Sequence, residues 1–293
     1  MISNERRGAF YALSSGLSYG FVAYFGVSII HASLSIANMS FWRYLIASSI
    51  VLVVVIVQRK HVVISSKELL IAFTNGCLFY GFSTLLFFSA CLYIGSGLSM
   101  VINYAYPAIV ILFNRGLYRK QIPRRYYFSA LAIIIGMLFF INPKAVDFDV
   151  FGIMVAVASS FFYACYIVSS KHMSMSMSPQ ASTLMVSLGC TVMCLILSLV
   201  DHSFFIPTTP IVWLNLFCIG IFSTALPILL LLKSLRYISS AKASLLSILE
   251  PIFIVILGVA LLGEPMTLNY VIGIVIILGG ALATLNRKEK VGR

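Results

Sequence analysis

Long apolar segments alternate with short polar connections along the whole chain. A membrane-spanning helix needs about 20 mostly apolar residues, and segments of this kind recur throughout the sequence. None of them alternates apolar and polar residues in the two-residue period of a membrane β-strand. The pattern predicts an all-α polytopic membrane protein with ten transmembrane helices, over residues 8–30, 36–57, 68–91, 96–115, 125–142, 150–170, 180–199, 210–232, 241–262 and 268–286.

The basic residues indicate how these helices are oriented. Of the 20 lysines and arginines, 18 fall in connections on the side that also carries both chain ends. Lys144 lies on the other side, and Arg43 lies within the second apolar segment. Loops rich in Lys and Arg mark the cytoplasmic face of a membrane protein. We therefore expect a multi-pass protein of the cell inner membrane with both termini in the cytoplasm.

The composition excludes soluble classes of protein. Hydrophobic residues make up 61% of the 293 residues and charged residues only 10%, and the mean hydropathy is +1.04. A soluble domain carries roughly 25% charged residues. The net charge of +12 does not indicate nucleic-acid binding, because the bases lie in short runs between apolar segments. We expect the lipid bilayer as a partner and no nucleic acid.

The chain resembles itself at a constant offset of 144 residues. Gly76 pairs with Gly220, Pro107 with Pro251, and Tyr126 with Tyr270, among other matches. Each copy contains five predicted helices, and an odd number places the second copy upside down in the membrane. Inverted repeats of this type build secondary transporters, with the substrate site near the midplane. We expect two inverted five-helix repeats, over residues 1–145 and 146–293.

The sequence also resembles a known family. The run AKASLLSILEPIFIVILGVALLGEPMTLNYVIGIVIILGGALA is similar to the second repeat of the EamA branch of the drug/metabolite transporter superfamily. Residues 93–142 resemble the equivalent part of the first EamA-like repeat, and Arg43 resembles the arginine of the family's second helix. The resemblance implies ten helices around a central cavity and transport of small metabolites. The first copy has Tyr106-Pro107 where the second has Glu250-Pro251, so the resemblance leaves proton coupling open.

Two charged residues inside predicted helices are candidate substrate-binding groups. Glu250 lies near the centre of its helix, where an ionised carboxylate is costly unless it is paired, hydrated or protonated. Arg43 lies about 10 Å below the outer surface at 1.5 Å per residue and offers a planar fork for a substrate carboxylate. The alternatives are a structural carboxylate for Glu250, and a structural ion pair or a snorkelling side chain for Arg43.

Polar, aromatic and proline residues in the predicted helices complete the candidate site. Tyrosine combines an apolar ring with a hydroxyl and suits an amphipathic metabolite, although a tyrosine near a helix end is more often an interfacial anchor. The further substrate-binding candidates are Tyr19, Tyr80, Asn103, Tyr106, Tyr163 and Ser247. A proline within a membrane helix breaks it where the helix lines a cavity or forms a hinge, or produces only a static kink. The candidate hinges are Pro107, Pro227 and Pro251.

These features favour a secondary transporter over an enzyme. The four histidines are isolated in or near loops, and only one buried carboxylate is expected, so we expect no catalytic site, metal or cofactor. The leading hypothesis is alternating-access transport of a small polar or amphipathic metabolite, an amino acid or related compound, in the export direction. The alternatives are import of a charged metabolite such as S-adenosylmethionine, and a membrane scaffold without transport. Protons are a candidate coupling ion, and a monomer is favoured.

Overall fold

The computed structural model describes residues 4–30, 34–58, 65–141, 149–262 and 266–285, and within these ranges it contains helices and no strand. The first half of the chain forms α1 (Asn4–Ile30), α2 (Ile36–Gln58), α3 (Ser66–Thr74), the π-helix η1 (Asn75–Gly81), α4 (Phe82–Asn103), α5 (Tyr106–Gly116) and α6 (Arg124–Leu138). The second half forms α7 (Val150–Ser176), α8 (Pro179–Val200), α9 (Pro210–Gly220), the π-helix η3 (Ile221–Ala225), α10 (Leu226–Tyr237), α11 (Ser240–Leu246), α12 (Leu249–Leu262) and α13 (Leu268–Leu285). The all-helical fold class is confirmed.

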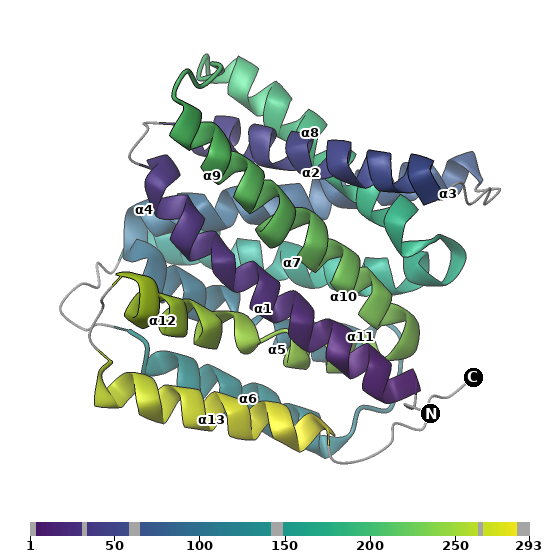
Figure 1. Cartoon of the computed structure of the whole chain (residues 1–293). Helices are drawn as coiled ribbons and strands as arrows, with labels where there is room; N and C mark the ends of the chain where they lie inside the picture. The colour runs from purple at the N-terminus through teal and green to yellow at the C-terminus, as the bar shows by residue number, and fades with distance from the viewer. Residues whose placement is uncertain (1–3, 31–33, 59–64, 142–148, 263–265, 286–293) are drawn as a thin grey trace.

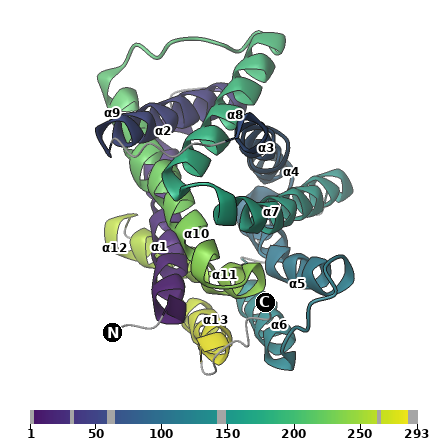
Figure 2. The same ribbon diagram turned by 90° about the vertical axis from the view of Figure 1, so that its right-hand side faces the viewer.

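The helices form an elongated bundle in which most cross from one end to the other (Figure 1). α2, α3, α8 and α9 occupy one side, and α6 packs against α13 on the opposite side (Figures 1 and 2). Between these two sides, α1 packs against α10 and α12, and α4 packs against α7. The first turn of α1 and the last turn of α13 lie at the same end of the bundle, on the right in Figure 1.

Several of these helices are suited to a bilayer. Six helical segments among the described residues are long and apolar enough to cross a membrane, and Leu268–Thr284 forms a shorter apolar helix. The candidate Ser66–Asn103 has 38 residues, but Gly95 interrupts it with a φ of 74°. This left-handed backbone conformation is readily adopted by glycine. The break falls between the predicted helices 68–91 and 96–115, so the segment contains two helices.

Irregularities in the helices occur at equivalent places in the two halves. The π-helices end at Gly81 and Ala225, which are 144 residues apart. The non-helical turn between α4 and α5 precedes Pro107, and the turn between α11 and α12 precedes Pro251, again 144 residues later. Both prolines therefore lie where a new helix starts. A proline is tolerated there because the first backbone N–H groups of a helix have no partner within the helix.

Glycines let the two halves pack on each other reciprocally. A Cβ added to Gly8 on α1 would lie 2.7 Å from the Tyr237 Cβ, and one added to Gly152 on α7 would lie 2.5 Å from the Tyr93 Cβ. Gly152 and Tyr237 are the 144-residue equivalents of Gly8 and Tyr93. The first helix of each half therefore packs against the end of the third hydrophobic segment of the other half.

Candidate functional site

Tyrosine side chains from several helices meet in the middle of the bundle. The Tyr19 and Tyr80 hydroxyls are 3.0 Å apart and share a hydrogen bond. The Tyr80 ring centroid lies 4.7 Å from that of Tyr166, and the Tyr163 ring meets the Tyr106 ring edge-on at 4.7 Å. We call the connected group the tyrosine cluster: Tyr19, Tyr44, Tyr80, Tyr104, Tyr106, Tyr163 and Tyr166. It joins the predicted residues Tyr19, Tyr80, Tyr106 and Tyr163.

Local helix geometry explains why these side chains converge. Tyr163 and Tyr166 are one turn apart on α7 and so lie on the same face. Tyr80 lies in η1, and a π-helical turn shifts the direction of the side chains that follow it. Tyr106 begins α5, directly after the break before Pro107. The cluster therefore depends on the same irregularities that relate the two halves of the chain.

Arg43 lies at one side of the tyrosine cluster and is only 4% exposed. Its Nη2 donates a hydrogen bond of 2.8 Å to the Tyr44 hydroxyl, and its Cζ lies 4.6 Å from the Tyr44 ring centroid and 5.9 Å from that of Phe88. Its Nε has no hydrogen-bond partner, and no acidic side chain among the described residues lies within 4.0 Å. Arg43 is therefore a buried cation with no carboxylate at ion-pair distance among the described residues.

Glu250 also lies beside the cluster, in the first turn of α12. Tyr104, Tyr106 and Tyr163 of the cluster lie close enough to its carboxylate to interact with it electrostatically. Glu250 is coupled to Arg43 without forming an ion pair with it. The two charged candidates therefore both lie beside the tyrosine cluster, and substrate binding by either stays a prediction.

The other predicted binding residues take up packing contacts. The Asn103 Oδ1 accepts a hydrogen bond of 3.1 Å from Ser159, and its backbone carbonyl accepts one of 3.0 Å from Ser160, which links α4 to α7. The Ser247 hydroxyl donates to the Ala243 carbonyl of its own helix at 3.0 Å. A substrate contact through Asn103 or Ser247 stays a prediction.

The three predicted hinge prolines all lie in the first turn of a helix. Pro107 begins α5 and Pro251 begins α12, each after a non-helical turn, whereas Pro227 begins α10 directly after η3. The Pro227 carbonyl accepts a hydrogen bond of 2.8 Å from the buried hydroxyl of Ser15 on α1. A break is present before Pro107 and before Pro251, whereas Pro227 lies in a continuous helical segment directly after η3. A gating role for the three prolines stays a prediction.

Sequence analysis did not select Tyr44, although it is fully buried beside Arg43. Its hydroxyl accepts from Arg43 and lies 2.8 Å from the Thr84 hydroxyl of α4. The signal available in the sequence was a tyrosine next to an arginine within an apolar segment. Without the fold, nothing distinguishes such a tyrosine from an interfacial anchor.

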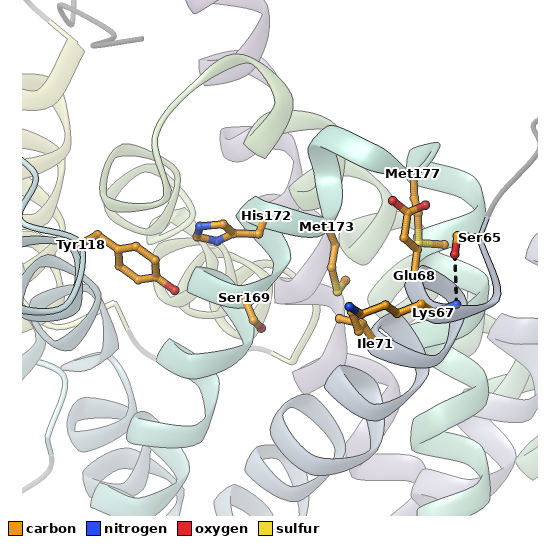
Figure 3. A pocket seen from close by; sticks show the side chains of 9 residues that line it. All are labelled: Ser65, Lys67, Glu68, Ile71, Tyr118, Ser169, His172, Met173 and Met177. Carbon is orange, nitrogen blue, oxygen red and sulfur yellow. Dashed lines mark hydrogen bonds between the residues drawn. The ribbon is translucent and has the colours of Figure 1, made fainter.

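A pocket of about 520 Å³ opens near the end of the bundle where α3 begins and α7 ends (Figure 3). Ligand pockets of small metabolites have volumes of about 300–1,000 Å³. The lining residues are Ser65, Lys67, Glu68, Ile71, Tyr118, Ser169, His172, Met173 and Met177. No group of three or more His, Cys, Asp and Glu that could hold a metal ion occurs within the described ranges.

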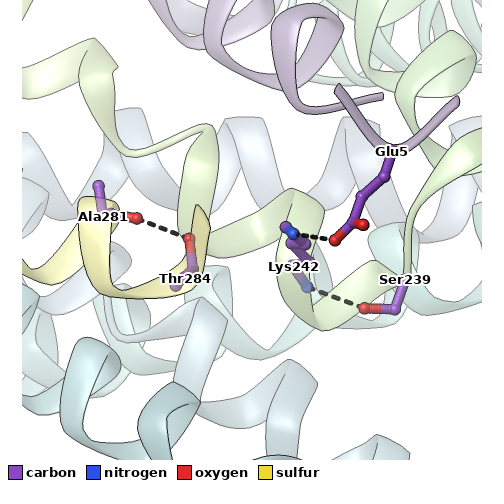
Figure 4. Close-up of polar contacts among 5 residues, drawn as sticks. All are labelled: Glu5, Ser239, Lys242, Ala281 and Thr284. Atoms are coloured by element: carbon purple, nitrogen blue, oxygen red, sulfur yellow. Dashed lines mark hydrogen bonds and ion pairs between the residues drawn. The ribbon is translucent and has the colours of Figure 1, made fainter. Parts of the chain in front are cut away.

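Charged side chains also hold helix ends together at this end of the bundle. Lys242 is 1% exposed, and its Nζ lies 2.5 Å from a carboxylate oxygen of Glu5 on α1 (Figure 4). The Lys171 ammonium donates to the backbone carbonyls of Leu235 and Ile238, where α10 ends. Cations are favourable near helix C-termini because they offset the partial negative charge there. These contacts connect α1 with α11 and α7 with α10.

The Glu5–Lys242 pair yields a stability prediction. We expect Glu5→Gln to lower the unfolding temperature in detergent, because breaking a buried ion pair leaves a charge without its partner, at a cost of up to about 3 kcal/mol with Glu5 partly exposed. Lys242→Met removes that charge and is expected to restore much of the stability in a Glu5→Gln background. Equal destabilisation in the single and the double variant would show that the pair is not what matters.

Comparison with known proteins identifies the family. The sequence profile of the EamA-like transporter family matches residues 6–142 and again residues 150–286. The chain belongs to the EamA-like transporter family. The two matches begin and end 144 residues apart, as the sequence repeat does. This EamA-like protein is thus a multi-pass membrane transporter with two copies of the family's unit.

Solved structures add agreement on the fold. One crystal structure, described only as that of a protein, has a TM-score of 0.79 and covers 94% of this chain and 95% of its own. Its sequence is only 16% identical, so this likeness concerns the fold alone. No curated protein matches the chain. The substrate of this EamA-like transporter must therefore be argued from its own residues.

Proposed function

We propose that this EamA-like protein is a secondary transporter that moves a small polar or amphipathic metabolite, an amino acid or related compound, out of the cell. Its two five-helix units, residues 1–145 and 146–293, are inserted in opposite orientations in the inner membrane, with both termini in the cytoplasm. The transport mechanism is alternating access, in which the two units exchange conformations around a site at the midplane.

The ten membrane crossings of this proposal are supported by the breaks in the long helices. Gly95 separates two crossings within Ser66–Asn103, and residues 238–239 separate α10 from α11 at the equivalent place. α3, η1 and the first part of α4 then form one crossing, as do α9, η3 and α10. The start of α1 and the end of α13 lie at the same end of the bundle (Figure 1). This arrangement agrees with an even number of crossings.

The single observation that carries the substrate proposal is Arg43, a buried guanidinium without an acidic partner among the described residues. A buried charge without a counter-charge is unstable in a low-dielectric setting, so a substrate carboxylate is the natural partner. Beside the same tyrosine cluster, Glu250 and the aromatic ring faces favour a positively charged group. An amino acid supplies both charges.

A transport assay tests this proposal through Glu250. We expect proteoliposomes with Glu250→Gln to transport free amino acids about tenfold more slowly, a loss of about 1.4 kcal/mol of binding or transition-state stabilisation. Transport of N-acetyl amino acids should change little, because these solutes lack the ammonium group that Glu250 attracts. The measurement is uptake of a radiolabelled panel of amino acids and of their N-acetyl derivatives.

Asp201→Asn is the matched control, because Asp201 is an exposed carboxylate at the end of α8. It should leave both rates unchanged. Equal loss of both solute classes in Glu250→Gln would indicate a structural carboxylate instead. If the correctly folded parent protein transported no member of a broad metabolite panel, the scaffold alternative would replace the transporter proposal. Opposed gradients of solute and protons in the same vesicles determine direction and coupling.

A further inference from the structure

The pocket in Figure 3 has two chemically different walls. On one side, the Tyr118 and His172 rings lie 5.0 Å apart and tilted by 31°. On the other side lie Lys67 and Glu68, both in the first turn of α3. Ser65 caps this helix by accepting a hydrogen bond from the Lys67 backbone N–H. The space of about 520 Å³ between these walls is sufficient for a small metabolite.

The α3 wall presents both signs of charge at adjacent positions. Lys67 is exposed and Glu68 half-buried, and both line the pocket. A solute with a carboxylate and an ammonium group can interact with both side chains at once, whereas a singly charged solute meets one attractive and one repulsive charge. The pocket therefore favours a zwitterion of the amino-acid type.

Asn75 bonds to the stretch of α7 that connects this pocket with the tyrosine cluster. It is 3% exposed, and its Nδ2 donates to the Ser170 hydroxyl at 3.0 Å and to the Met173 sulfur at 3.5 Å. Its Oδ1 accepts a hydrogen bond from Ser169, which lines the pocket. Ser169 in turn donates to the backbone carbonyl of Tyr166, a member of the cluster, at 3.1 Å. One face of α7 thus leads from the pocket, past Asn75, to the cluster.

We propose that this pocket is a loading site for a zwitterionic metabolite, separate from the central site and accessible from the end of the bundle that carries the start of α1. The metabolite binds between Lys67 and Glu68 on α3 and the Tyr118–His172 wall. It reaches the tyrosine cluster when the contacts of Asn75 with α7 separate. This inference rests on the proposed transport function and adds a second binding site to it.

Kinetics measured separately at the two membrane faces test the loading site. We expect Lys67→Gln and Glu68→Gln each to raise the KM for a zwitterionic amino acid about fivefold at the pocket face, since an exposed charge contributes up to about 1 kcal/mol. The maximal rate from the pocket face and the KM at the opposite face should stay unchanged. The maximal rate from the opposite face should fall about fivefold, because a substitution cannot shift the equilibrium of the solute between the two sides. The measurement uses right-side-out and inside-out vesicles, with amino acids as the probe and Arg115→Gln, an exposed charge on α5, as the control.

The outcomes distinguish a loading site from a pocket without a role in transport and from a lipid-binding site. A KM that rises equally at both faces, or at neither, overturns the loading site while leaving the transporter proposal intact. Transport by the parent protein of no amino acid at all overturns the transporter proposal instead. A zwitterionic lipid headgroup has the same chemistry as the solute, so the assay is repeated in vesicles of phosphatidylglycerol alone. An effect present only when phosphatidylethanolamine is included contradicts a solute site, and the same effect in both lipids supports it.

Discussion

Replacing Arg43 with glutamine is expected to lower the transport efficiency for carboxylate-bearing solutes about 100-fold, a loss of about 2.8 kcal/mol. The guanidinium is 4% exposed and has no acidic partner within 4.0 Å among the described residues, so a substrate carboxylate bound there loses its counter-charge. Glutamine keeps a polar side chain that can still contact the Tyr44 hydroxyl. The measurement is initial uptake of a radiolabelled amino acid and of its carboxamide in proteoliposomes.

Selectivity between these two solutes separates a binding role from a structural one. The carboxamide has no negative charge, so its transport should fall much less in Arg43→Gln than transport of the free acid. Arg115→Gln removes an exposed arginine and should affect neither solute. A parallel loss of both solutes, accompanied by a lower unfolding temperature, would indicate that Arg43 only holds α2 against α4 through its contact with Phe88.

Substituting alanine for Gly76 is expected to destabilise the fold by about 3 kcal/mol, a typical cost of a severe overpacking substitution. A Cβ at this position would lie 2.1 Å from the Val186 carbonyl oxygen and 2.6 Å from its Cα. Both are backbone atoms, so no side-chain rotation relieves the overlap and η1 must move away from α8. Thermal unfolding of the purified protein in detergent measures the change.

Gly97→Ala is the matched control for this substitution. Gly97 lies in α4, and among the described residues no atom outside its own stretch of helix lies within 4 Å of a Cβ added there. We expect its unfolding temperature to equal that of the parent protein or to rise slightly, because alanine favours helix more than glycine does. Similar unfolding temperatures for Gly76→Ala and Gly97→Ala would contradict the close packing of η1 on α8.

The repeat is the feature for which sequence and structure agree most closely. An offset of 144 residues was visible from pairs such as Pro107 and Pro251, since glycine and proline have backbone roles that other residues do not share. The structure places helix starts at both prolines and π-helices that end at Gly81 and Ala225, the same distance apart. The two π-helices could not be predicted from the sequence, because a π-helical turn has no distinctive pattern of apolar residues.

Most of the candidate binding residues chosen from the sequence lie together in the fold, although their binding role stays a prediction. Arg43, Glu250 and the tyrosines 19, 80, 106 and 163 were selected because polar groups in apolar helices are costly, and the fold brings them together around the cluster. Asn103 was selected on the same argument, but its amide oxygen accepts from Ser159 at the α4–α7 contact. Burial cost identifies which side chains need partners. It does not identify whether the partner is a substrate or a neighbouring helix.

Lys242 illustrates the same limit outside the site. From its position in the sequence, Lys242 is one of several bases in a connection that we expect on the cytoplasmic side. In the fold it is buried and paired with Glu5. These residues are separated by 237 positions. No local pattern relates them, because the contact between α1 and α11 depends on how the two halves pack.

The sequence by itself determined the all-helical membrane class and the two related halves, because both depend on hydrophobicity and spacing along the chain. Its resemblance to EamA transporters indicated the family. Only the tertiary structure decided that Arg43 and Glu250 both lie beside the tyrosine cluster without an ion pair, and that Asn75 bonds to the part of α7 that leads from the pocket to this cluster. Such arrangements depend on the rotation and depth of each helix. Backbone contacts at glycines, as between Gly76 and Val186, help to set both.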